Sequence, residues 1–146
     1  MLFKMRVLYF SKNKEGNAEE TARHIARALK TTSDQIPPAY PSESEKLLFI
    51  GVDSDSGKPD KTIMDFCANL SPNRAKNVAF FAINKHGSGD ILASLKEAVQ
   101  KKGVDVVGDP LLIKAPGLLK QGRMKDSDFK TVEDWANKIV AIVAEK

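Results

Sequence analysis

The chain has 146 residues, of which 42% are hydrophobic and 29% charged, a balance typical of one folded domain over residues 1–146 and not of a disordered chain. Its single cysteine excludes an intrachain disulfide and a cysteine metal site, and two histidines argue against a histidine metal site. The net charge is +4, but basic residues are scattered and do not alternate with aromatic ones, so we expect no nucleic-acid partner.

The first elements along the chain are a strand, a polar loop and a helix. Residues 5–10, MRVLYF, form an apolar run typical of a buried strand. Residues 18–29 repeat apolar side chains at helical spacing and carry charge on the other face. Asn17 is the candidate N-cap of this helix, and Glu20 stands where a capping box has its acid.

The loop before this helix is a candidate anion site, because the first helical N–H groups have no backbone partner and the helix dipole favours negative charge there. The side chains that can add donors or positive charge are Ser11, Lys12, Asn13, Lys14 and Asn17. The acids that repel a phosphate and suit an ordinary loop before an acidic first turn are Glu15, Glu19 and Glu20. Both interpretations stay open, and the loop matches neither the Walker pattern nor the dinucleotide fingerprint.

A proline-rich connection and a second apolar run come next. Residues 31–46 contain three prolines and predict at most a short edge strand at residues 35–36. Residues 46–52, KLLFIGV, predict a buried strand. The strand leads into a turn-rich polar loop at residues 53–60.

The second predicted helix begins after this loop. Asp60 is its candidate N-cap, and Ser71-Pro72 ends it. Cys67 lies on its inner face, where we expect a buried, inert thiol. Residues 77–83, NVAFFAI, then predict a third buried strand.

The last third of the chain repeats the alternation. A polar loop at residues 84–90 precedes a helix that begins at Ser88 or Asp90 and has Gly103 as its C′ residue.

Residues 104–107 and 111–113 read as one strand interrupted at Gly108-Asp109-Pro110, and a loop follows. Trp135 lies on the apolar face of the terminal helix, so we expect it in the core and not at a ligand.

Apolar strands that alternate with amphipathic helices predict an α/β fold, a doubly wound parallel five-stranded sheet with helices on both faces. In the strand order 2-1-3-4-5, three loops leave the carboxyl ends of strong strands and meet at one edge: residues 11–17, 53–60 and 84–90. All three loops are polar and contain glycine. We expect a ligand at this edge.

The chain resembles the flavodoxin-like family over nearly its whole length, and flavodoxin is itself the standard example of this strand order. The family's first loop, often T/S-x-T-G-N-T, wraps the phosphate of flavin mononucleotide (FMN) at the helix N-terminus. Ser11 stands at the start of the corresponding loop, and Gly16-Asn17-Ala18 match its G-N-T portion with alanine for threonine. Asn13, Lys14 and Glu15 stand where small hydroxyls are usual, and the spacing is two residues longer.

This resemblance implies an FMN-binding redox protein that transfers electrons to or from a protein partner. The family's second and third loops hold the isoalloxazine ring, and neither corresponding loop contains an aromatic residue. The cofactor-binding residues that the resemblance implies are Ser11, Lys12, Asn13, Lys14, Glu15, Gly16, Asn17, Ala18, Val52, Asp53, Ser54, Asp55, Gly57, Asn84, Lys85, His86 and Gly87. No catalytic residue and no metal ligand is assigned.

Three alternatives remain beside this hypothesis. The absent aromatics leave room for a substrate, as in a small FMN-dependent quinone-type reductase. They also suit a flavodoxin-fold module that has lost the flavin and serves as a binding or interaction protein. A phospho-signalling receiver shares the strand order, and Asp53 resembles its phosphoacceptor, but the acidic pair that holds Mg²⁺ is missing after the first strand.

The expected surroundings follow from charge and hydropathy. No run approaches the roughly 20 apolar residues of a membrane helix, and residues 1–10 lack the apolar core and cleavage site of a signal peptide. We therefore expect a cytoplasmic protein with no membrane partner. Its positive net charge favours an acidic redox partner.

Overall fold

The computed structural model describes residues 3–11, 16–54, 57–114 and 126–146. The elements in chain order are β1 (Met5–Ser11), α1 (Asn17–Leu29), β2 (Ser33–Gln35), β3 (Glu45–Asp53), α2 (Lys61–Ala68), β4 (Ala75–Asn84), α3 (Asp90–Lys101), β5 (Asp105–Val106), β6 (Leu111–Lys114) and α4 (Asp126–Ala144). The strands form one sheet in the order β2-β1-β3-β4-β5, with β6 also paired to β4, and every pair is parallel. The predicted fold class and strand order are confirmed.

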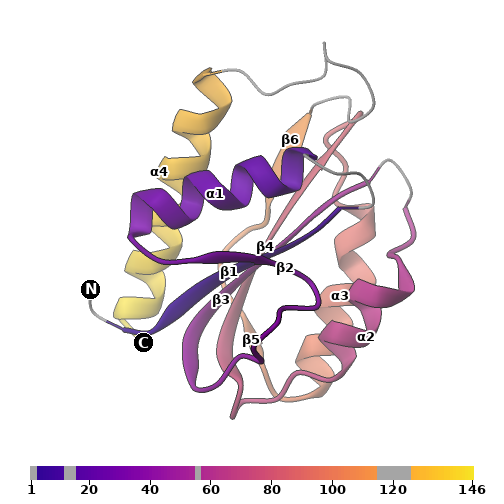
Figure 1. The fold of residues 1–146 in the computed structure, drawn as a ribbon, viewed down its shortest axis with the longest axis vertical. Helices are drawn as coiled ribbons and strands as arrows, with labels where there is room; N and C mark the ends of the chain where they lie inside the picture. The colour runs from indigo at the N-terminus through magenta and orange to yellow at the C-terminus, as the bar shows by residue number, and fades with distance from the viewer. Residues whose placement is uncertain (1–2, 12–15, 55–56, 115–125) are drawn as a thin grey trace.

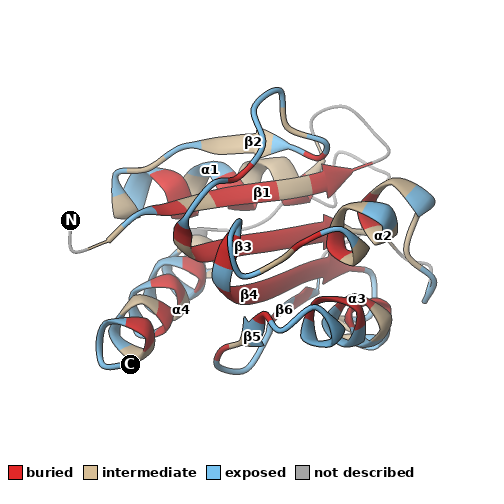
Figure 2. Ribbon diagram, turned by 90° about the horizontal axis from the view of Figure 1, so that it is seen from below, coloured by how far each residue is buried: buried red, intermediate tan, exposed pale blue. Residues whose placement is uncertain are grey.

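Two helical layers enclose the sheet, with α1 and α4 on one face and α2 and α3 on the other (Figure 1). The strands are apolar on both sides because both faces are covered. In β3, for example, Phe49 packs into the core beside α1 and α4, and Ile50 packs into the core beside α2 and α3. Figure 2 shows the three central strands buried along most of their length and the helices buried mainly along one side.

The last predicted strand forms two short strands, β5 and β6, which both pair with β4 on the same side. β5 pairs with Asn77 and Val78, and β6 pairs with the later part of β4, from Phe81 onward. Gly108 separates the two pieces with a φ of +68°, and a Cβ there would lie 2.5 Å from the Ile139 side chain. A residue with a side chain therefore suits this break poorly. The sheet has five positions, as predicted, although six strands fill them.

The helix ends agree with the sequence at three places and differ at two. α2 ends at Ala68 with Asn69 as its C-cap, before the predicted end at Ser71-Pro72. Asp60 caps α2, because its carboxylate accepts a hydrogen bond from the Thr62 amide at 2.9 Å. α3 begins at Asp90, and Gly103 follows its C-cap with a φ of +83°. The prediction for α1 is wrong: Gly16 is its N-cap, and Asn17 is the first helical residue. The short edge strand is present as β2, slightly earlier in the chain than predicted.

The prediction for Cys67 is confirmed, and Trp135 is partly buried and packs against the core beside α1 and α4. Trp135 packs edge-on against Phe49 and Phe81, with ring centroids 5.5 and 6.2 Å apart, and its indole N–H donates to the Asp109 carbonyl. Cys67 is buried, and burial raises the pKa of its thiol to about 12, so it stays protonated at neutral pH. Within the described ranges, no helix is both long and apolar enough to cross a membrane.

Candidate functional site

The carboxyl ends of the central strands lie side by side, which brings the three predicted loops to one edge of the sheet. Ser11, the last residue of β1, pairs in register with Asp53, the last residue of β3. Asp53 in turn is opposite Ile83 near the end of β4, and the Ser54 amide donates to the Ile83 carbonyl at 3.3 Å. The expected convergence of residues 11–17, 53–60 and 84–90 is therefore present where these segments are described.

Asp53 links the end of β3 to the beginning of α1. Its Oδ2 accepts a hydrogen bond from the Ala18 amide at 2.8 Å. Ala18 is fully buried and is the second residue of the helix, so its N–H has no partner within α1. The carboxylate thus caps the beginning of α1, whereas Asn17, the predicted N-cap, is the buried first residue of the helix. A residue distant in sequence supplies the cap.

Gly16 lies directly against this carboxylate. A Cβ at Gly16 would lie 2.3 Å from Ser11 Oγ and 2.4 Å from Asp53 Oδ2, closer than any side chain tolerates. A larger residue here would displace the Ser11 or Asp53 side chain, because three segments meet at this point: the end of β1, the end of β3 and the beginning of α1. Ser11, Gly16, Asn17, Ala18 and Asp53 form one contiguous group at this corner, as the first-loop prediction requires.

A cavity of about 260 Å³ opens on the other side of the Asp53 backbone, between the ends of β1 and β3 and the beginnings of α2 and α3. Its lining residues are Phe10, Val52, Asp53, Ser54, Lys58, Pro59, Asp60 and Ile91. Four of the lining residues are apolar, and the other four carry two carboxylates, a hydroxyl and an amine. Val52, Asp53 and Ser54 of the predicted site therefore line a real cavity.

Several of these lining residues, among them Phe10 and Ile91, are not among the predicted site residues. Phe10 precedes the predicted Ser11 and faces the opposite side of β1, because successive strand residues alternate between faces. That alternation was the available signal. Ile91 is in the first turn of α3, and only the three-dimensional packing of α3 beside α2 brings it here.

The third loop is held by its own side chains. Asn84 is buried, and its amide nitrogen donates to the Ser88 carbonyl while its amide oxygen accepts from the Ser88 amide, both at 2.7 Å. Gly87 has a φ of +65° and lies close to Lys114 at the end of β6. The loop thus packs against β6, and Asn84 shapes it. Asn84, Lys85, His86 and Gly87 do not line the cavity.

The remaining predicted residues divide into exposed ones and ones that the structure does not describe. Gly57, Lys85 and His86 are exposed at this edge. Lys12, Asn13, Lys14, Glu15 and Asp55 lie outside the described residues.

Charges of both signs surround the site. Asp53, Asp60 and Lys58 line the cavity, and Glu19 in the first turn of α1 pairs with Arg23 one turn later. Burial, followed by the charge of Glu19, raises the pKa of Tyr9, so this phenol stays neutral. No cluster of histidine, cysteine, aspartate and glutamate with metal-binding geometry occurs within the described ranges.

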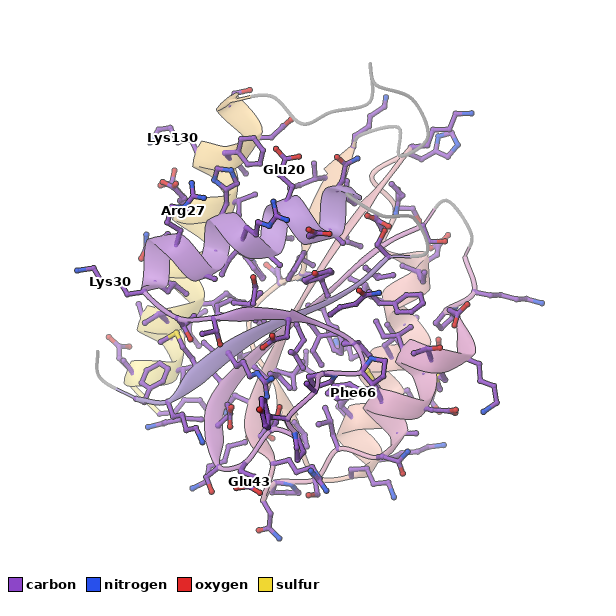
Figure 3. The ribbon with its side chains drawn as sticks, viewed as in Figure 1. Glu20, Arg27, Lys30, Glu43, Phe66 and Lys130 are labelled. Carbon is purple, nitrogen blue, oxygen red and sulfur yellow. The ribbon has the colours of Figure 1, made fainter. Side chains whose placement is uncertain are left out.

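A larger cavity of about 490 Å³ lies elsewhere, between α2 and the proline-rich connection after β2. Its walls include Pro37, Pro38, Phe66 and Leu70, and Figure 3 shows Phe66 on α2 where it faces this connection. The larger cavity does not touch the three converging loops. We place the candidate site at the carboxyl edge, because parallel sheets bind their ligands there.

Comparison with known proteins identifies the fold. No family model matches the chain, and no curated protein matches it. Solved structures do match. A flavodoxin from Streptococcus pneumoniae TIGR4 is 13% identical, with a TM-score of 0.67 over 94% of this chain and 98% of that one. The fold is flavodoxin-like.

Two further flavodoxin-like structures agree with this result. A short-chain flavodoxin associated with a bacterial microcompartment is 12% identical, with a TM-score of 0.68 over 96% of this chain and 99% of that one. Rubredoxin:oxygen oxidoreductase from Desulfovibrio gigas is 14% identical, with a TM-score of 0.72 over 97% of this chain and 36% of that larger one. The flavodoxin-like fold therefore accounts for nearly the whole chain.

Proposed function

We propose that this protein is a flavodoxin-like flavoprotein that binds a flavin at the carboxyl edge of its sheet and transfers electrons to or from a protein partner. The observation that carries the proposal is the cavity at the ends of β1 and β3, in a chain whose fold matches flavodoxins along nearly its whole length. A bound flavin would supply the electron chemistry, and the protein would bind the flavin and tune its potential.

The cavity suits the isoalloxazine ring in chemistry. The ring is planar, with apolar faces and hydrogen-bonding edges. Phe10, Val52 and Ile91 offer apolar contact, and Ser54 and Lys58 offer polar partners. The cavity volume of about 260 Å³ is slightly below the range of roughly 300–1,000 Å³ usual for small-molecule sites. We therefore expect a ring that is only partly enclosed, with an edge accessible to a partner.

The phosphate of FMN fits less well. FMN is the flavin that the family resemblance implies, and its phosphate would need donors at the N-terminus of α1. The Ala18 amide already donates to the Asp53 carboxylate there. The residues present therefore fit the ring and do not fit the phosphate while Asp53 holds this position.

The chain's own charges would set the preference of the site for one redox state of the flavin. Asp53 and Asp60 in the cavity wall oppose negative charge on the ring, and Lys58 favours it. The chain's net charge of +4 supports an acidic partner surface.

One observation favours a second candidate function. The Ala18 amide at the beginning of α1 already has an acceptor in the Asp53 carboxylate, so this amide does not need a bound anion. A flavodoxin-fold binding module that has lost the flavin is consistent with this arrangement. The binding experiment below separates the two functions.

Flavin binding can be tested by adding riboflavin or FMN to the purified protein and measuring quenching of flavin fluorescence. We expect saturable binding that weakens at least about tenfold in Ser54→Leu, because the larger side chain enters the cavity. Ser127→Leu makes the same change on the exposed face of α4 and should leave the affinity unchanged. Absence of saturable binding of either flavin would refute the flavin function and favour the flavin-free module.

A further inference from the structure

The position of Asp53 is fixed by the pairing of its backbone in the sheet and by the contacts of its carboxylate. Its backbone pairs with Ser11 of β1 and Ile83 of β4, so the residue lies inside the ladder of the sheet. Its Oδ2 reaches the Ala18 amide at 2.8 Å and packs against Gly16. Neither the strand nor the helix needs to move for the carboxylate to occupy this position. Asp53 is therefore a fixed acceptor at the N-terminus of α1.

The same position is where a flavin phosphate would require its donors. An amide N–H that donates to a carboxylate is not free for a phosphate oxygen, and two negative groups this close repel each other. The first turn adds Glu19 and Glu20, of which Glu19 is paired with Arg23. Among the described residues, the acids Asp53, Glu19 and Glu20 therefore oppose a phosphate at this helix end, although helix N-termini ordinarily favour anions.

We infer that Asp53 is a specificity-determining residue of the proposed flavin site. Its carboxylate takes the anion position at the beginning of α1, so the site selects an uncharged flavin, of the riboflavin class, over a flavin that carries a terminal phosphate. This inference rests on the proposed flavin function and adds which chemical form of flavin the site accepts. Selection arises from repulsion of the wrong ligand and not from extra contacts to the right one.

The experiment compares the dissociation constants of FMN and riboflavin for the wild type and two variants. In the wild type, FMN should bind no more tightly than riboflavin. Asp53→Asn keeps an oxygen that accepts from Ala18 and removes the charge, so it should shift the FMN-to-riboflavin affinity ratio toward FMN by about tenfold or more. Glu19→Gln removes one charge from the same helix turn without touching the Ala18 amide, and should shift the ratio by less than about threefold.

A second measurement does not depend on flavin. Titration with inorganic phosphate, followed by backbone amide chemical shifts, should move the Ala18 signal in Asp53→Ala, which removes both the charge and the acceptor of this amide, and leave it in place in the wild type.

The outcomes separate the inference from the function beneath it. Wild-type protein that binds FMN at least about tenfold more tightly than riboflavin would overturn the inference and leave the flavin function standing. An unchanged ratio in Asp53→Asn, or an equal change in Glu19→Gln, would also overturn it. Failure of both flavins to bind the wild type and both variants would overturn the flavin function and the inference together.

Discussion

Replacing Asp53 with alanine should destabilise the protein even without any ligand. The change removes the acceptor of the Ala18 amide, which is buried, and a buried unsatisfied donor costs about 1–3 kcal/mol. The usual cost of losing an N-cap, about 1 kcal/mol, describes the loss of this same hydrogen bond, so the two figures are not added. Asp53→Asn keeps an acceptor and loses only the charge at the helix end, for about 0.3–1 kcal/mol.

Urea unfolding followed by Trp135 fluorescence measures both variants, because Trp135 packs against Phe49 and Phe81 in the core. We expect a lower midpoint and an unchanged slope for each variant, with the larger loss in Asp53→Ala. Circular dichroism of the folded proteins checks that the helices remain. Equal stability of Asp53→Ala and wild type would refute the cap, and an equal loss in both variants would refute the role of the retained acceptor.

Three further predictions concern the core and the cavity. Gly51→Ala places a Cβ 1.9 Å from the Phe81 ring in the centre of the sheet, so we expect a loss of about 1–3 kcal/mol or more in urea unfolding, and wild-type stability would refute the packing. Burial raises the pKa of Cys67 to about 12 from 9.0, so the neutral thiol stabilises the fold fully below about pH 9, and this stabilisation is lost as the pH rises toward 12. The free energy of unfolding should therefore fall more steeply over this pH range in the wild type than in Cys67→Ala. The same pH dependence in both proteins would contradict the burial of the thiol. Lys58→Gln should lower the midpoint potential of a bound flavin, because it removes positive charge from the cavity wall. Lys61→Gln removes a charge from an exposed side chain of α2 and should leave the potential unchanged. Equal shifts in the two variants would exclude a local effect of Lys58.

The sheet could be predicted from the sequence because its strands are continuous apolar runs. Residues 46–52 and 77–83 are almost continuously apolar, as strands covered on both faces are, and their alternation with amphipathic helices indicates a parallel sheet. The interruption at Gly108 was also visible, since Gly108-Asp109-Pro110 breaks a strand in any context. Local sequence patterns were therefore sufficient to predict the strands and the class of sheet.

The site was less predictable because its contacts are long-range. Asn17 has the residue type and position of an N-cap, but the cap is Asp53, 35 residues away from Ala18. Ile91 lines the cavity through the packing of α3, which no local pattern specifies. Asn84 looked like a ligand donor, and its amide is bonded within its own loop.

The measurement that tests the central claim most directly is a riboflavin titration of isotope-labelled protein followed by backbone amide chemical shifts. Binding at the carboxyl edge predicts the largest shifts at Val52, Ser54, Lys58 and Ile91, around the cavity of about 260 Å³. Shifts confined to Ser42, Phe66 and Leu70 would place the ligand in the cavity of about 490 Å³ beside α2. No shifts at all would mean that the protein does not bind riboflavin. Either of these results would contradict the proposed function.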